Sequence, residues 1–141
     1  MCFDLGGSRL VEITSELVKR VFGLPMGPIN LVEKKKANKK NDVVIQEFRN
    51  QFEHTDSKRL SSLQLMCYVL DMYDHGRLFV VNFLILYFSF LGETTTNNSG
   101  NVRYIPCIQP HVDIKSLNWC SYMVSCLNRT KKAWHGSQDA L

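Results

Sequence analysis

A run of 14 residues, apolar or aromatic except for Asn82 and Ser89, constrains the fold of this chain most strongly. It covers residues 78–91. As a helix it would be about 21 Å long, shorter than the roughly 30 Å of a bilayer core. An apolar helix of this length is typical of the centre of a globular core. We therefore predict a buried core helix with Phe83 and Leu86 inside. The alternatives are a membrane span, or a strand, because aromatic and β-branched residues also suit a sheet.

Helical spacing of apolar residues recurs elsewhere in the chain. A first short helix should follow Thr14 or Ser15, either of which can cap it, and Gly23 and Pro25 should end it. Ser57 is a candidate cap for a later helix. The further predicted helices cover residues 43–53, 58–73 and 115–133, and we expect them to pack around 78–91.

The first residues favour extended backbone. Residues 3–13 read as two short strands around Gly6 and Gly7, whose freedom to adopt positive φ suits a tight turn. The sequence thus predicts a mainly α-helical fold with a small N-terminal β-hairpin. We expect one domain over residues 1–135, an exposed basic loop at 33–41 and a flexible tail at 136–141.

The positive charge is concentrated in one segment. The chain has 17 Lys and Arg against 13 Asp and Glu. Without the five lysines of this segment the balance is 12 against 13, or −1. A nucleic-acid surface spread over the whole molecule is therefore not indicated. The lysines concerned are Lys34, Lys35, Lys36, Lys39 and Lys40.

Three interpretations of the lysine run remain open. It is a solvated loop without a partner, a nuclear import signal, or a phosphate contact. Five lysines could neutralise about five phosphates, which would give weak, salt-sensitive and sequence-blind binding. A partner, if there is one, is accordingly expected to be nucleic acid or a nuclear protein.

The cysteines indicate a reducing compartment. There are five, an odd number, and no pair has the CxxC spacing. We find no apolar segment typical of a secretory leader near the N-terminus, where Asp4 and Arg9 interrupt the sequence. Free, mostly buried thiols are expected. We therefore predict a nuclear or cytoplasmic protein that is neither secreted nor membrane-bound.

A cysteine-protease interpretation has candidates on paper. It requires a thiolate, a histidine and an orienting group. Cys120 or Cys126 with His111 or His135 and Asp113 would supply these residue types. Cys126 falls on a predicted apolar helix stripe, and no pattern marks an oxyanion site. We expect buried thiols and surface imidazoles, and no enzymatic activity.

A zinc site is also not expected. The candidate ligands Cys107, His111, Cys120 and Cys126 have a spacing that matches no common finger or ribbon. Cys120 and Cys126 are separated by about 240° around a helix, so they would not face one ion. No glycine-rich loop leads into a Lys-Ser or Lys-Thr helix start. We predict no metal, cofactor or small-molecule ligand.

Several segments resemble a plant family. They are Ile13–Val18, Val21–Gly27, Ile45–Phe48, Phe79–Leu86 and Asn118-Trp119. Their order resembles that of transposon-derived domains of the aminotransferase-like plant mobile type. Such domains also occur upstream of ubiquitin-like-protein-specific cysteine protease domains in plant mobile-element proteins.

The resemblance implies a function without implying aminotransferase chemistry, because we find no motif that would hold pyridoxal phosphate. It implies a non-enzymatic, transposon-derived interaction module in the nucleus, associated with nucleic acid or chromatin protein. The alternative is an accessory segment of a ubiquitin-like-protein-specific protease that lacks its catalytic domain.

Overall fold

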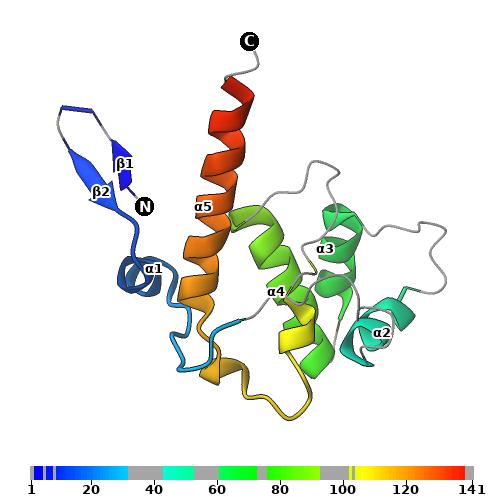
Figure 1. Ribbon diagram of the computed structural model, residues 1–141. Helices are drawn as coiled ribbons and strands as arrows, with labels where there is room; N and C mark the ends of the chain where they lie inside the picture. Colours follow the sequence, from blue (N-terminus) through cyan, green and yellow to red (C-terminus); the bar gives the residue numbers. More distant parts are fainter. Residues whose placement is uncertain are drawn as a thin grey trace. The chain divides into compact units, whose positions relative to one another are not determined.

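The computed structural model is mainly helical, with a small N-terminal β-hairpin (Figure 1). This confirms the predicted fold class. The contacts group the chain into two compact units, described separately below. Unit 1 combines Met1–Leu31 with Asp113–Leu141, and unit 2 is Val32–Val112. The structure describes residues 2–4, 6–7, 9–31, 43–52, 61–72, 76–92, 102 and 104–138, without the side chains of 3, 4 and 133–138.

The hairpin of unit 1 agrees with the sequence prediction. Strand β1 (Cys2–Asp4) pairs antiparallel with β2 (Leu10–Glu12), and Phe3 lies opposite Val11. Gly6 and Gly7 have φ angles of 81° and 60°. Glycine adopts this left-handed backbone without the steric penalty that a side chain brings, so the turn depends on the Gly-Gly pair.

Helix α1 (Ser15–Phe22) begins and ends at the predicted residues. The Thr14 hydroxyl accepts a hydrogen bond from the Leu17 amide at 3.2 Å, and Gly23 ends the helix at φ 66°. These contacts satisfy backbone groups that the helix ends leave unpaired. The helix buries Val18 and packs against α5 (Figure 1).

Helix α5 (Trp119–Gln138) is the long element of unit 1 and differs from the prediction at both ends. A short 3₁₀ helix, Ile114–Ser116, precedes it. The helix continues past the predicted end at residue 133 as far as Gln138. The flexibility expected for residues 136–141 stays a prediction. Helical backbone past Gly136 is compatible with the modest penalty of a glycine near a helix end. The side chains buried in its first two turns are those of Trp119, Cys120, Tyr122, Met123 and Cys126.

A backbone clamp joins the two parts of unit 1, the segment 25–29 and the segment 116–119. Four backbone hydrogen bonds of 2.7–3.2 Å connect them. Met26 pairs with Asn118 and Ile29 pairs with Leu117 as isolated bridges. A Cβ atom at Gly27 would collide with the backbone of Ser116, so only glycine permits this close approach.

Within its described residues, unit 2 has three α-helices and a short 3₁₀ helix. They are α2 (Val43–Asn50), α3 (Ser62–Asp71), α4 (Arg77–Leu91) and η2 (Ile105–Cys107). Helix α3 lies beside α4, and α2 contacts both α4 and η2 (Figure 1). The core side chains of these elements include Val44, Phe48, Leu65, Ile85, Phe88 and Ile105.

The start of α3 differs from the predicted one. Ser61 caps it, and a capping box joins the Ser61 and Gln64 side chains to each other's backbone amides. This arrangement satisfies two amides at once, which stabilises the first turn. The predicted cap, Ser57, lies outside the described residues, as does the predicted helical segment 58–60.

Helix α4 is apolar but not buried on all sides. One face, with Val81, Ile85 and Phe88, is inaccessible to solvent. Phe83 is 48% exposed and Leu86 is half-buried, so the prediction that Phe83 lies in the core was wrong. Residues 83 and 85 point in directions about 200° apart around a helix. The side of α4 with Ile85 is covered, and the side with Phe83 is exposed.

Helices α2, α3 and α4 belong to unit 2, whereas α5 belongs to unit 1. The predicted packing of α2 and α3 against α4 is confirmed. The predicted packing of the helix at 115–133 against α4 stays a prediction. In the part of the chain that the structure describes, no helix is both long and apolar enough to cross a membrane.

Candidate functional site

The predicted basic run lies outside the described residues. This applies to Lys34, Lys35, Lys36, Lys39 and Lys40. The import and phosphate-contact interpretations therefore remain predictions, and so does the interpretation of an exposed loop at 33–41.

Each of the two thiols of α5, those of Cys120 and Cys126, has a hydrogen-bond partner. The Cys120 thiol donates to the Leu24 carbonyl at 3.2 Å, and burial raises the pKa of Cys120, with Lys19 lowering it to a smaller extent. The Cys126 sulfur accepts a hydrogen bond from Arg129 at 3.3 Å and is buried. A buried thiol with a raised pKa is a poor nucleophile.

Of the other candidate triad residues, Asp113 and His111 are described with their side chains. The Asp113 carboxylate accepts from the Lys115 amide at 3.0 Å, where it caps the 3₁₀ helix Ile114–Ser116. His111 is exposed. The His135 side chain is not among those that the structure describes. Among the described residues there is no group of three His, Cys, Asp or Glu side chains that would hold a metal ion.

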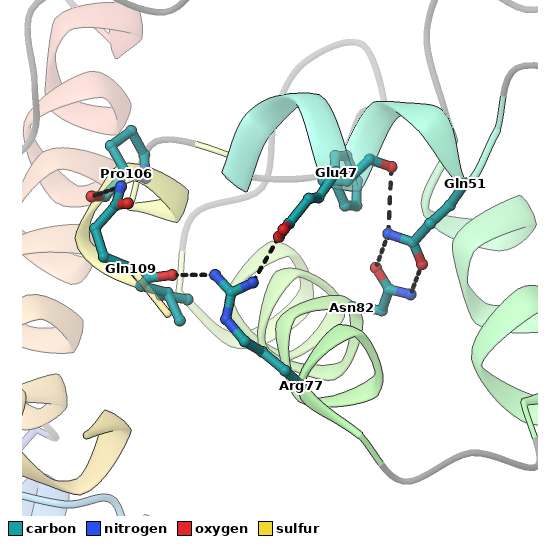
Figure 2. A network of polar contacts seen from close by, with 8 residues as sticks. Glu47, Gln51, Arg77, Asn82, Pro106 and Gln109 are labelled. Atoms are coloured by element: carbon teal, nitrogen blue, oxygen red, sulfur yellow. Dashed lines mark hydrogen bonds and ion pairs between the residues drawn. The ribbon is translucent and has the colours of Figure 1, made fainter. Parts of the chain in front are cut away.

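A polar network of unit 2 joins α2, α4 and the segment after η2 (Figure 2). Arg77, at the start of α4, donates to Glu47 at 2.6 Å and to the Ile108 carbonyl at 2.6 Å. The guanidinium therefore fixes three chain segments with one side chain. Planar donors in a fixed geometry suit arginine for this role better than lysine.

A pair of amides forms the second half of the network. The Asn82 amide nitrogen donates to the Gln51 side-chain oxygen at 2.8 Å, and Gln51 also donates to the Phe48 carbonyl at 3.3 Å (Figure 2). Asn82 is completely buried. A buried amide without partners costs about 1–3 kcal/mol, so this contact allows a polar residue inside α4.

The network is structural in character. Gln51 and Asn82 do not titrate near neutral pH, and Arg77 has its donors directed at Glu47 and Ile108. Sequence reasoning missed it, although Asn82 interrupts the apolar run. That interruption was the available signal, because a polar residue inside a buried helix requires a partner.

Exposed aromatic side chains form a different kind of feature on α4. Phe83 and Phe90 are 48% and 57% exposed, and Leu91 is 47% exposed. The Phe83 ring centroid lies 6.4 Å from that of Phe79 and 6.2 Å from that of Tyr87, so a row of rings extends along the helix. We call Phe83, Phe90 and Leu91 the α4 surface.

Helix α3 also exposes apolar residues. Leu63 and Leu70 are 60% and 76% exposed, and Met66 and Cys67 lie between them on the same side. We call these four residues the α3 stripe. Its spacing of three and four residues is that of one helix face. Grouped exposed apolar residues of this kind often mark an interaction site.

The charge of these two helices is low. In α3 and α4 the charged residues are Asp71 and Arg77, and Arg77 is paired with Glu47. A nucleic-acid surface requires several basic groups, whereas an apolar and aromatic surface suits a protein partner. The described surfaces of α3 and α4 are therefore apolar and aromatic rather than basic.

The chain was compared with known proteins and protein families. No curated protein and no solved structure matches it. A family model described as "Domain of unknown function (DUF8566)" matches residues 1–140. Since the match covers nearly all of the 141 residues, the chain belongs to the DUF8566 family.

Proposed function

We propose that this protein is a non-enzymatic interaction module whose α4 surface docks a protein partner. The observation that carries the proposal is the exposure of Phe83, Phe90 and Leu91 on a helix whose opposite face is fully buried. Exposing large apolar side chains to water is unfavourable, and covering them on binding recovers free energy of about 25 cal/mol per Å². Aromatic residues commonly dominate such interfaces.

Two sequence features support a nuclear partner and a transposon-derived origin. The first is the resemblance to plant mobile domains in segments such as Val21–Gly27 and Asn118-Trp119. The second is the basic run between residues 34 and 40, which suits an import receptor. We therefore propose a nuclear or chromatin-associated protein as the partner, in preference to nucleic acid itself.

A photo-crosslinking experiment tests the α4 surface. A benzophenone amino acid replaces Phe83 or Phe90 in the full chain, and nuclear extract is the probe. Replacement of Phe22, an exposed phenylalanine of α1, is the matched control. We expect a discrete protein adduct from positions 83 and 90 but not from position 22. Excess wild-type protein should suppress this adduct, and the double variant Phe83→Asp/Phe90→Asp should not.

Three results would contradict the proposal. Adducts of equal intensity at position 22 would indicate nonspecific contact. Adducts that disappear after nuclease treatment would indicate contact through nucleic acid. An adduct with a ubiquitin-like precursor alone would favour the protease-accessory alternative instead of a chromatin protein.

The lysine run has a separate test, because its residues are not part of the α4 surface. All five lysines are changed to Gln in a chain fused to a fluorescent reporter. Loss of nuclear enrichment supports an import signal. Loss of affinity for duplex DNA at low salt, with a flatter salt dependence, supports a phosphate contact. If neither property changes, the run is a solvated loop and the nuclear assignment is without this support.

A further inference from the structure

Helix α3 has two apolar faces, and packing within unit 2 uses one of them. Ser62 and Leu65 are buried where α3 lies against its neighbours. The α3 stripe (Leu63, Met66, Cys67 and Leu70) lies about 100–200° around the helix from Leu65. A surface helix of a globular protein normally presents polar residues in that direction.

From the α3 stripe we infer that the protein self-associates through α3, with two copies of the helix packed antiparallel about a two-fold axis. This inference does not rest on the proposed function, because it uses α3 and not the α4 surface. The stripe has the three- and four-residue spacing with which one helix packs against another. A self-complementary stripe is what a two-fold interface requires.

The charges at the two ends of α3 favour the antiparallel orientation. The helix has no acidic residue in its first turn and no basic residue in its last turn, where Asp71 is the final residue. Its own dipole therefore opposes the Asp71 charge. A parallel copy would place one Asp71 beside the other. An antiparallel copy places each Asp71 beside the positive end of the other helix.

The register follows from the stripe. If the two-fold axis passes between Met66 and Cys67, Leu63 of each copy faces Leu70 of the other. The same register sets Asp71 opposite Ser62, the first residue of the second copy's helix. Apolar contact and charge complementarity thus agree on a single alignment.

The central position of Cys67 provides a direct probe. In this register the two Cys67 residues are offset by about 1.5 Å along the helix axes and lie on the same side of the seam. At an interaxial distance of about 8–10 Å, a short thiol crosslinker can join them. Cys67 is exposed and so is accessible to reagent.

Only four apolar side chains per copy form the contact, so the interface is small. Interfaces below about 1,200 Å² are typical of weak association. We expect a dimer with a dissociation constant in the micromolar range. Sedimentation equilibrium of the full chain between about 1 and 200 μM should show a reversible monomer–dimer equilibrium.

Variants make the test specific. Leu70→Lys should raise the dissociation constant at least about tenfold, because it places charge at the apolar contact. The matched control is Leu10→Lys, which changes a leucine of β2 that is 69% exposed, against 76% for Leu70, and should have no effect. Asp71→Lys should weaken association by a smaller factor. Bismaleimide should give a crosslinked dimer that is lost in Cys67→Ser and retained in Cys2→Ser.

The outcomes decide between occupants of the stripe. A chain that is monomeric up to 200 μM overturns the inference, as does a dimer that survives Leu70→Lys. If Leu70→Lys unfolds the protein, the crosslink of the wild-type chain still decides. Dimer crosslinks through Cys2 and not Cys67 would place the interface elsewhere. Protection of Cys67 from reagent in a monomer would mean that the chain covers the stripe itself.

Discussion

Within each unit, a different kind of contact holds the chain segments together. Unit 1 is closed by backbone, since the segment around Gly27 pairs with the segment that leads into Trp119. Unit 2 is closed by side chains, through Arg77 and the Gln51–Asn82 amide pair. The backbone clamp leaves no room for a side chain at Gly27, whereas a side-chain network depends on the residue type of each of its members. The comparison predicts where each unit is vulnerable.

The two units also differ in how their longest described helices, α5 and α4, use their apolar residues. Helix α5 buries Trp119, Met123 and Cys126 in sequence order on one face. Helix α4 buries a similar face but exposes Phe83 and Phe90 as well. This excess of exposed apolar surface in unit 2 is the reason for placing the interaction site there.

The largest expected effect is a difference in stability between alanine variants on the two faces of α4. Phe88→Ala should lower the free energy of unfolding by about 3–5 kcal/mol, because it leaves a cavity beside Tyr104, whose ring centroid is 5.3 Å away. Phe83→Ala, the matched change at a position about 140° away around the helix, should lower it by less than about 1 kcal/mol. Urea denaturation of both variants measures the difference. Equal losses would contradict the two-faced description of α4.

The clamp of unit 1 should be nearly as sensitive at a single position. Gly27→Ala should destabilise the protein by more than about 2 kcal/mol, because the new Cβ meets the Ser116 backbone, which cannot move as a side chain can. Asn30→Ala, at an exposed position nearby, serves as the control. A neutral Gly27→Ala variant would mean that the clamp is dispensable.

The amide pair of unit 2 should show coupling. Asn82→Leu removes the donor that the Gln51 side-chain oxygen accepts from and should cost about 1–3 kcal/mol. Adding Gln51→Leu should recover part of this loss, because both polar groups are then gone. A double-mutant cycle followed by thermal unfolding gives the coupling energy. Additive losses would show that the two amides act independently.

The ion pair should contribute less. Glu47 and Arg77 side chains are 40% and 28% exposed, so solvent screens their attraction. Glu47→Gln should cost no more than about 1 kcal/mol at low salt and less at 1 M salt. Measurements of the unfolding free energy at both salt concentrations test this. A loss that is large and independent of salt would assign Glu47 a packing role instead.

The smallest effect concerns pH. Burial raises the pKa of Cys120, so the folded state keeps the thiol proton to higher pH than the unfolded state does. The resulting stability is fully present below the unfolded pKa and declines as pH rises through it toward the folded pKa. Cys120→Ala should therefore cost less stability at pH 10 than at pH 7. A cost that grows with pH would have the wrong sign.

Local signals in the sequence predicted unit 1 well. Thr14, Gly23 and the Gly6-Gly7 turn act through contacts within four residues of themselves, and these contacts follow from general rules of capping and turns. The pairing of Met26 with Asn118 was not predictable in this way. The two residues are 92 positions apart, and nothing in their chemistry specifies a backbone partner.

Unit 2 was predicted less completely for a related reason. Its helices were recognised from periodicity, but the uniformly apolar sequence of α4 does not distinguish a covered face from an exposed one. Phe83 and Phe88 are the same residue type, and only the packing of other parts of the chain around α4, such as Tyr104 against Phe88, gives them different exposure. The candidate interaction surface could therefore not be derived from the sequence, and the lysine run that the sequence did single out lies outside the described residues.

Hydroxyl-radical footprinting tests the central claim most directly, that α4 buries one face and presents the other to a partner. Phe83, Phe90 and Phe88 share a residue type and a helix, so their oxidation rates report exposure without correction for intrinsic reactivity. The structure predicts fast oxidation of Phe83 and Phe90 and slow oxidation of Phe88. Equal, slow oxidation of all three would show that α4 is covered on every side, and would contradict the account.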